Sequence, residues 1–314
     1  MLFPNEDGLL YQTTLRSPDT GASARCEWRH MCALQSGARQ FLEEKLALDG
    51  TVVDAMLASG TRPRILFRKE GVLINVRGIN AADPNKPEDM ISLRLWIGEH
   101  SIVTCRRRDL AAVEEIIELI ERGEGPSTAG EFVTMVITRV FTQMESFVEA
   151  LEHRVEVLEE AFEKDADNTV IDDAVLVRRR GTIYRRHIAP QKMILERLQV
   201  GKVAWLSEEN KEELAESLDQ VIRYTEMLSD LQERTKILNE EIRSRQADRL
   251  NSTAYLFSVA ATIFLPLSFL TGLMGINTAG IPGANSQWGF VVFVALCAAL
   301  GVAQIVYFRK KNWF

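Results

Sequence analysis

Three consecutive residues, Gly275-Ile276-Asn277, follow a long apolar run and carry the clearest chemistry in this sequence. In a symmetric assembly, one Asn277 from each copy would form a ring of amides whose carbonyl oxygens can face a cation without adding charge. Such a ring suits a divalent ion that keeps much of its water, because small divalent cations such as Mg²⁺ dehydrate reluctantly. Asn277 is therefore the candidate metal-contacting residue, and Gly275, Ile276 and Asn277 together are the candidate selectivity site.

The apolar run before this tripeptide has one face of small or polar residues. Two interpretations of that face are open. Small residues commonly allow close packing of helices in lipid, or the face could line a central pore. In a pore, rings of Leu265 and Phe257 would act as hydrophobic gates that close by dewetting. The members of the face follow one another at alternating steps of three and four, which places them on one side of a helix: Asn251, Ala254, Ser258, Ala261, Leu265, Ser268 and Gly272.

Between Asn251 and Phe308 the chain has no Asp, Glu, Lys, Arg or His. This stretch contains two apolar runs, at 252–273 and 290–308, each close to the ~20 residues that a helix needs to cross a bilayer. A polar, glycine-rich segment separates them. The sequence therefore predicts two membrane-spanning helices. The absence of Asp, Glu and His argues against a proton relay of such side chains inside the membrane.

Basic residues flank the two runs. Arg243, Arg245 and Arg249 precede the first run, and Arg309, Lys310 and Lys311 follow the second. Short flanks rich in Lys and Arg stay on the cytoplasmic side of a membrane. We therefore expect both termini to be cytoplasmic, with the loop that contains Asn277 facing outward.

The first 250 residues form a charged body with a net charge of about −10, since only three of the 37 Lys and Arg and none of the 44 Asp and Glu lie beyond it. Alternating or β-branched residues predict strands at 64–67, 72–79, 91–97 and 101–105, with a weaker candidate at 26–33. Helices are predicted at 36–48, 51–58 and 109–122, the last with Asp109 as its N-cap. The simplest architecture is an antiparallel or mixed sheet with helices packed on it.

From about residue 131 the body is predicted to be helical, with a second long helix at 169–200. A third helix begins at Ser207, a good N-cap, and contains no Gly or Pro before Pro266. It can therefore continue into the first apolar run, and over 207–273 it would be about 100 Å long. Its apolar or Thr positions follow a heptad rhythm, which predicts self-association around an axis: Leu214, Leu218, Val221, Thr225, Leu228, Leu231, Thr235, Leu238 and Ile242.

The predicted fold is an α+β membrane protein. It has an N-terminal α/β cytoplasmic domain, a long helical stalk continuous with the first transmembrane helix, and two C-terminal transmembrane helices. The predicted parts are an α/β domain at 1–126, a helical hairpin at 127–206, the stalk at 207–251, the first span at 252–273, the extracytoplasmic loop at 274–289, the second span at 290–308 and a cytoplasmic tail at 309–314.

Other residues that could do chemistry lie in the charged body. Cys26, His30 and Cys32 would share one face of a strand and could hold zinc, but ordinary packing is the favoured interpretation because their spacing matches no closed zinc module. His153 and His187 are expected at surfaces or interfaces. Glu240 and Glu241 lie just below the first span and could ring an inner exit if the heptad seam faces the axis.

Two function classes are not expected from this sequence. The basic run around Arg178-Arg179-Arg180 and Arg185-Arg186-His187 is interpreted as a solvated face, and the acidic body lacks any nucleic-acid reader motif. No phosphate-binding Gly-rich loop, nucleophile motif or metal-hydrolase spacing is present, so neither an enzyme nor a resident cofactor is expected.

The residues of the apolar segment resemble a known family. The stretch from Ala260 to Gly272, the tripeptide at Gly275, and a second span ending Tyr307-Phe308-Arg309-Lys310-Lys311 are similar to the CorA-type divalent cation transporters. In that family a Gly-Met-Asn tripeptide ends the pore helix, and here Ile276 replaces the Met. This departure is similar to the ZntB zinc-transporter branch, as are two stretches of the body, Thr61-Arg62-Pro63-Arg64 and 184–191.

The resemblance implies a homopentamer in the cytoplasmic (inner) membrane of a bacterial-type cell, with a funnel-shaped cytoplasmic domain. It implies a pore lined by the first span, with Asn277 as the outer ring and Ser268, Leu265, Phe257 and Asn251 as inner rings. The implied cargo is Zn²⁺, with Cd²⁺, Ni²⁺, Co²⁺ or Mg²⁺ as further candidates. The alternatives are a CorA-like magnesium and cobalt channel, or a membrane scaffold that transports nothing and in which Asn277 is only a loop residue.

Overall fold

The computed structural model describes residues 3–15, 26–80, 89–98, 100–164, 169–276 and 286–311. The chain divides into two compact units, Met1–Asn239 and Glu240–Phe314. Helix α6 (Glu208–Met274) contributes residues to both units.

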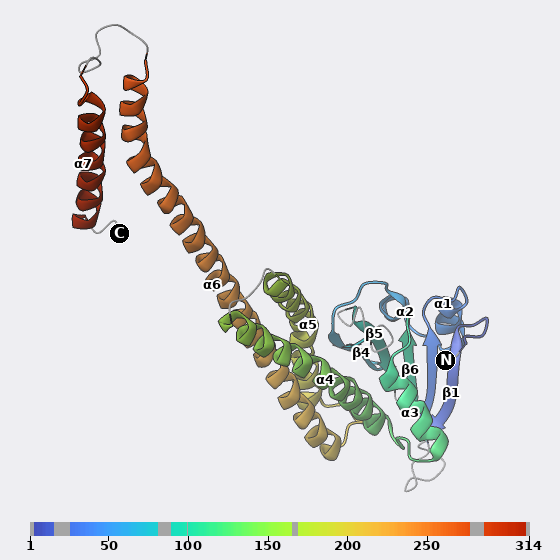
Figure 1. The fold of residues 1–314 in the computed structure, drawn as a ribbon. Coiled ribbons are helices and arrows are strands. Elements are labelled where there is room, and N and C mark those ends of the chain that lie inside the picture. The colour runs from blue at the N-terminus through green and yellow to red at the C-terminus, as the bar shows by residue number, and fades with distance from the viewer. Residues whose placement is uncertain are drawn as a thin grey trace. The chain divides into compact units, whose positions relative to one another are not determined.

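The first unit contains a six-stranded mixed sheet (Figure 1). Strand β2 is central to its topology, because it pairs in parallel with β6 while every other neighbouring pair is antiparallel. The spatial order is β1-β2-β6-β5-β4-β3. The strands are β1 (Leu9–Leu15), β2 (Cys26–Cys32), β3 (Arg64–Phe67), β4 (Val72–Gly78), β5 (Ile91–Ile97) and β6 (Ser101–Arg106).

Short helical elements cover one face of this sheet. They are α1 (Ala38–Gln40), a π-helical turn (Phe41–Lys45) and α2 (Gly50–Leu57). Leu42, Val53 and Met56 from these elements pack with Met31 and Val103 of the sheet in one buried apolar cluster. Buried apolar side chains of this kind each contribute about 1.5–3 kcal/mol to stability, so this cluster anchors the elements to the sheet.

Longer helices pack on the opposite face. Trp28 of β2 stacks against Phe132 of α4 (Ala129–Glu163), with ring centroids 4.6 Å apart. The backbone of Gly78 in β4 approaches Leu110 before α3 (Ala111–Arg122) so closely that a Cβ atom there would lie 2.7 Å from Leu110 Cδ1. The sheet is thus sandwiched between two helical layers.

The predicted strands are all present, and the mixed sheet is confirmed. Strand β1 was not predicted. The predicted helix at 36–48 is reduced to α1 and the π-helical turn. The predicted N-cap at Asp109 is wrong, because α3 starts after Leu110 and the Asp109 carboxylate instead pairs with the buried guanidinium of Arg106. Leaving a buried cation without a counter-charge costs more free energy than leaving the start of a helix without a side-chain cap.

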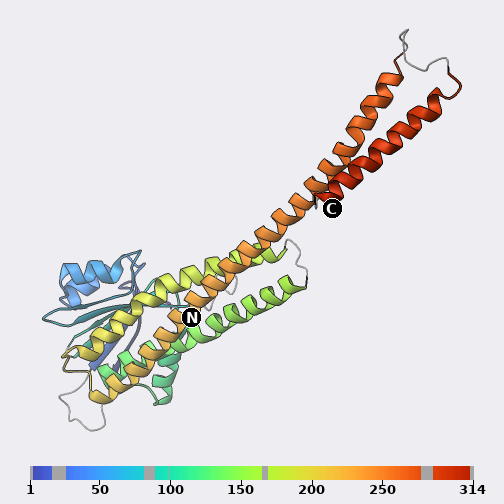
Figure 2. The same ribbon diagram turned by 90° about the vertical axis from the view of Figure 1, so that its left-hand side faces the viewer.

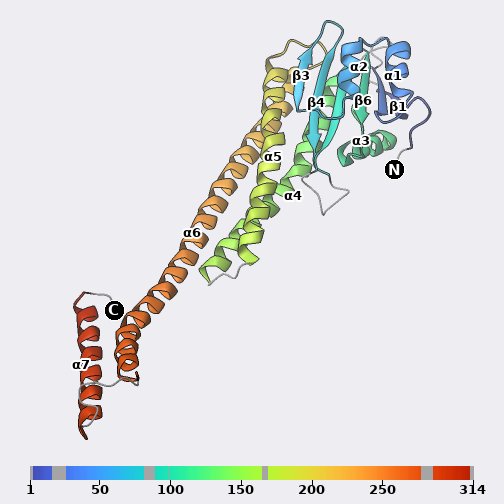
Figure 3. The ribbon, with the colours of Figure 1, turned by 90° about the horizontal axis from the view of Figure 1, so that it is seen from above.

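Helices α4, α5 (Thr169–Val200) and the first part of α6 run side by side (Figures 2 and 3). The predicted N-cap of α6 is confirmed, since the backbone N–H of Asn210 donates to Ser207 Oγ over 3.1 Å. Farther along, Arg234 Nε of α6 donates to Glu159 Oε1 of α4 over 2.9 Å. The three helices therefore form one intramolecular bundle.

The heptad seam of α6 is buried inside that bundle. Between residues 214 and 238 its positions are fully buried, apart from Leu218 and Thr225, which are half-buried. The prediction that this part of the seam drives self-association is therefore wrong. A helix in the middle of a bundle and a helix in a coiled coil need the same apolar spacing, so the sequence pattern does not distinguish them.

The two stretches of the body that resemble zinc transporters meet beside strand β4. Gln191 accepts a hydrogen bond from the backbone N–H of Arg77 over 3.0 Å and donates one to the Arg77 carbonyl over 3.1 Å. The Arg77 guanidinium in turn donates to the carbonyl of Thr61 over 2.7 Å. Gln191 thus joins α5 to the sheet by two hydrogen bonds to the backbone of one residue, which fixes the hairpin on the sheet.

His30 lies within the sheet layer, almost completely buried. Its Nδ1 is 2.7 Å from Thr104 Oγ1, which also accepts from Trp28 Nε1 over 2.9 Å. Burial, and then the positive charge of Arg106, lower the pKa of His30 to about 3. The imidazole is therefore neutral in the folded protein at any pH near neutrality.

Replacing His30 with Gln should weaken the acid sensitivity of folding. Between pH 6.5 and about 3 the unfolded chain protonates this imidazole and the folded chain does not, so the free energy of unfolding falls as pH falls, by about 1.4 kcal/mol per pH unit. The stabilising effect is complete above pH 6.5. Denaturant unfolding of the full chain in detergent from pH 6.5 to 4.5 measures this slope.

The matched control is His153→Gln, because His153 is exposed and lies 3.5 Å from Glu156 on the same helix. His187, whose pKa is lowered to about 4 by burial first and then by neighbouring arginines, adds a slope of the same sign in every variant. Equal slopes for wild type and the His30→Gln variant would contradict the assignment.

Truncation of the buried α6 stripe should destabilise the chain itself. Leu228 is fully buried whereas Ile237 on the same helix is about half exposed. We expect Leu228→Ala to lower the free energy of unfolding by about 2–5 kcal/mol through lost burial and a new cavity, and Ile237→Ala by less than about 1 kcal/mol. Denaturant titration compares them, and equal losses would show that the stripe is not an intramolecular core.

Candidate functional site

The second unit contains two helices that are long and apolar enough to cross a membrane, the C-terminal part of α6 and α7 (Gly289–Lys310). In Figures 1 and 2, α7 runs antiparallel beside the last turns of α6. The Arg and Lys that end α7 therefore lie at the same end of the pair as Arg249 of α6. The two basic flanks that predicted the topology therefore lie toward the same end of the helix pair.

One face of α6 is covered by α7. Val259 is buried there, and Ile263, Pro266, Leu267 and Leu270 are partly covered. From α7 the covered positions recur every three or four residues and end at Phe308, which is buried. One polar residue of α7, Gln304, lies on this inner face. It was not singled out from the sequence, although an amide in an otherwise apolar span is a signal that could have identified it.

All predicted pore-lining residues lie on the uncovered side of α6. At about 100° per residue, this face lies roughly opposite the one that packs on α7. Its apolar members are strongly exposed, Phe257 at 73% and Leu265 at 67%. The exposed positions are Asn251, Ala254, Phe257, Ser258, Ala261, Leu265, Ser268 and Gly272. The chain by itself thus leaves this surface without a partner among the described residues.

The hydroxyl groups of this segment fall into two classes. Those of Thr253, Thr262 and Thr271 donate to backbone carbonyls of their own helix, over 2.7–3.0 Å. The hydroxyls of Ser258 and Ser268, on the uncovered face, make no hydrogen bond to any described residue. The two serine hydroxyls on this face are therefore free to interact with water or with an ion, while the three threonine hydroxyls off the face are bonded to the helix itself.

Helix α6 ends just before the predicted selectivity tripeptide. The backbone N–H of Gly275 donates to the carbonyls of Thr271 and Gly272, both over 3.1 Å, and Ile276 is exposed. Asn277 lies outside the described residues. The structure therefore places the start of the tripeptide at the end of the uncovered face, and the role of Asn277 stays a prediction.

At the other end of the second unit, Glu240 and Glu241 are both exposed. Glu240 faces away from the buried stripe of α6, about 160–200° from Leu238 and Ile242. Glu240 therefore lies about 20° from Asn251, on the side of α6 that carries the predicted pore-lining residues. The role of Glu240 and Glu241 at an inner mouth stays a prediction.

The candidate zinc ligands of the body are not gathered into a site. No group of three or more His, Cys, Asp or Glu that could hold a metal occurs in the ranges that the structure describes. His30 is hydrogen-bonded to Thr104, and burial raises the pKa of the Cys26 thiol to about 11, which disfavours the thiolate that zinc requires. These residues are part of the core, as the favoured interpretation expected.

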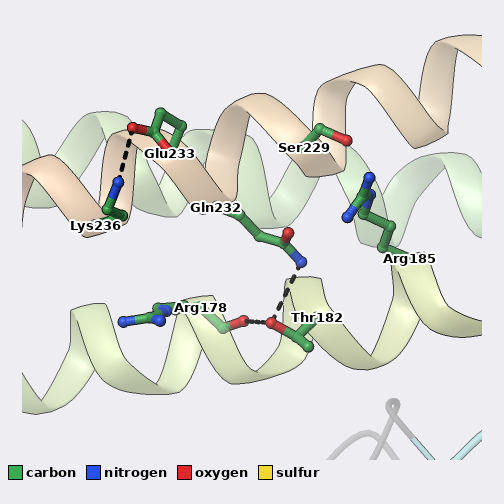
Figure 4. Close-up of a pocket in the computed structure, with 7 residues that line it drawn as sticks. All are labelled: Arg178, Thr182, Arg185, Ser229, Gln232, Glu233 and Lys236. Carbon is green, nitrogen blue, oxygen red and sulfur yellow. Dashed lines mark hydrogen bonds and ion pairs between the residues drawn. The ribbon is translucent and has the colours of Figure 1, made fainter.

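The basic run of α5 faces a shallow groove between α5 and α6 (Figure 4). Arg178 and Arg185 line this groove with Lys236, whose ammonium lies 3.2 Å from Glu233, and Gln232 donates to Thr182 Oγ1 over 3.3 Å at its centre. The side chains of Arg178 and Arg185 are exposed. Arg178, Arg179, Arg185 and Arg186 therefore lie on a solvated face, as predicted, whereas Arg180 and His187 of the same run are half-buried.

Comparison with known proteins adds to this geometry. Residues 23–310 match the family model described as CorA-like Mg2+ transporter protein. The chain is 32% identical over 289 residues to the divalent cation transporter CmaX of Pseudomonas aeruginosa, covering 91% of this chain and 87% of that protein. It is 26% identical over 301 residues to the zinc transport protein ZntB of Pectobacterium atrosepticum, covering 96% and 92%.

Similarity extends to the three-dimensional structure. The structure of full-length CmaX superimposes with a TM-score of 0.83 at 30% identity, over 98% of this chain and 99% of that one. The match therefore includes both units and both apolar helices. From the family model and these relatives together, this chain belongs to the CorA-like family of divalent cation transporters.

Proposed function

We propose that this chain carries Zn²⁺ across the cytoplasmic membrane through a central pore lined by the uncovered face of α6. The proposal rests on the difference between the two sides of α6 in the apolar run. One side packs on α7, and the other presents small residues, unbonded hydroxyls and two large apolar side chains to a partner that the single chain does not supply.

A pore requires more than one copy of this face, because one helix cannot enclose a channel. The resemblance to the family supports a homopentamer, in which α6 would line the axis and α7 would face lipid. Phe290 and Val292 of α7, which are strongly exposed, suit contact with hydrocarbon. With both basic ends at one side of the helix pair, both termini would be cytoplasmic.

Within this pore, each ring would have its own task. Asn277 would select ions at the outer mouth, and Ser268 and Asn251 would offer oxygen atoms to a hydrated cation. Leu265 and Phe257 would close the pore when their rings dewet. The spans hold no Asp, Glu, Lys, Arg or His, so the pore itself would neither trap the ion by charge nor pass protons along a carboxylate or imidazole relay.

We propose zinc rather than magnesium because of the similarity to ZntB, and not because of the chemistry of the residues in the tripeptide. Ile276 stands where the CorA-type tripeptide has Met, as in the ZntB branch, and its side chain offers no ligand to either ion. The similarity to ZntB spans nearly the whole chain. A magnesium and cobalt channel is the competing assignment, and the flux experiment separates the two.

Ion flux into proteoliposomes tests the pore and the ion together. We expect Zn²⁺ flux to exceed Mg²⁺ flux in wild type. Asn277→Ala should reduce Zn²⁺ flux by about tenfold or more, a factor that corresponds to about 1.4 kcal/mol, because each copy loses its coordinating amide. Asn285→Ala, in the same loop, is the matched control and should leave flux near wild type.

Two results would overturn parts of this assignment. Mg²⁺ flux in preference to Zn²⁺ would make the protein a magnesium channel with the same pore. Absence of flux for both ions from well-assembled wild-type protein would favour the scaffold alternative.

A bulky substitution tests which side of α6 faces the ion path. Ala261→Phe adds a ring to the uncovered face and should abolish Zn²⁺ flux by obstructing a narrow pore. Ala298→Phe adds the same ring to the exposed side of α7, where lipid can accommodate it. Equal flux in the two variants, with equal assembly by size-exclusion chromatography, would place the ion path elsewhere.

A further inference from the structure

Pro266 interrupts the backbone hydrogen bonding of α6 without ending the helix. The residue lies inside α6, which continues as far as Met274. Because proline has no N–H, it cannot donate to the carbonyl four residues earlier, which belongs to Thr262. The Thr262 carbonyl is thus deprived of its helical partner in the middle of the apolar run.

Gln304 of α7 lies against this carbonyl. Its Nε2 donates to the Thr262 carbonyl over 3.5 Å, whereas its Oε1 is buried without a hydrogen-bond partner among the described residues. Between Phe290 and Val306 it is the sole residue with an amide or hydroxyl side chain. The contact therefore joins the one polar group that this stretch of α7 contains to the one carbonyl that proline releases in α6.

The pairing of the Thr262 carbonyl with Gln304 is important because the contact lies in the apolar run. Lipid offers no hydrogen bonds, so an unpaired backbone carbonyl there is costly and is normally paired by a neighbouring helix. Yet hydrogen bonds between membrane helices contribute only about 0.6 kcal/mol on average. At 3.5 Å, with Oε1 unpaired, the Gln304 contact is long and one-sided, so it can hold α6 at Pro266 without locking it.

The position of Pro266 links this contact to the selectivity tripeptide. Pro266 lies between Leu265 and Ser268, two of the proposed pore rings, and the segment beyond it ends at Gly275 and Ile276. We propose that Gln304 is a positioning residue, which holds α6 at Pro266 and so sets the orientation of residues 267–276 with the tripeptide at their end. This inference rests on the proposed pore.

A double-mutant cycle tests the contact. Gln304→Leu removes the donor, and Pro266→Ala restores an N–H that pairs with Thr262 inside the helix. We expect Gln304→Leu in the wild-type background to lower the ratio of Zn²⁺ to Mg²⁺ flux by about threefold or more, the factor that corresponds to ~0.6 kcal/mol. In the Pro266→Ala background the same change should have no further effect, because the carbonyl is already paired.

The control is Phe293→Leu, a change at another inward-facing position of α7 that makes no hydrogen bond. Its effect should be equal in both backgrounds. The readout is an ion ratio, which a change in the amount of folded protein does not move. If Pro266→Ala fails to assemble, Pro266→Leu restores the same N–H and replaces it in the cycle.

Each outcome decides a separate point. Independent, multiplicative effects of Gln304→Leu and Pro266→Ala, with normal wild-type flux, would overturn the positioning role and leave the proposed pore intact. No flux in wild type would overturn the proposed function, and the transport role of Gln304 with it. A ratio that depends on Gln304 only when Pro266 is present would support both.

Discussion

The constraint on which this structure depends is that hydrocarbon supplies no hydrogen bonds. Residues 252–308 carry no charged side chain, so their backbone groups must be paired within the helices and the few exceptions must be met by a neighbour. The chain meets this constraint with two helices placed side by side. The surface of α6 that remains after they pack carries small residues and serine hydroxyls, and it is the surface that we propose lines the pore.

A single helix serves two environments in this protein. In water, α6 buries its apolar stripe between α4 and α5, and the pair of Arg234 and Glu159 joins it to α4. In the apolar run, the covered side of the same helix packs on α7. The buried stripe ends at Ile242 and the uncovered face begins at Asn251, nine residues later and about 180° away around the helix, so the same spacing has a different meaning in each length of α6.

Much of the architecture could be predicted from the sequence, for identifiable reasons. The charge-free runs and the Ser207 cap defined α6 and α7, and β-branched alternation defined β4, β5 and β6. Elsewhere a tertiary contact overrode a local sequence rule, because Asp109 pairs with Arg106 instead of capping α3. The uncovered face of α6 followed from spacing alone. Gln304 did not, because its importance depends on a carbonyl that only the packed helices bring near it.

The parallel pairing of β2 with β6 has a consequence for synthesis. These strands are about seventy residues apart in sequence, and the loop between them must close before the centre of the sheet exists. Yet Arg106 leaves the ribosome well before the apolar helices do, and N-terminal domains generally fold first. The order of the elements along the chain therefore allows the water-soluble unit to reach its native state while the segments that need a bilayer are still being made, so that sheet formation and membrane insertion do not compete.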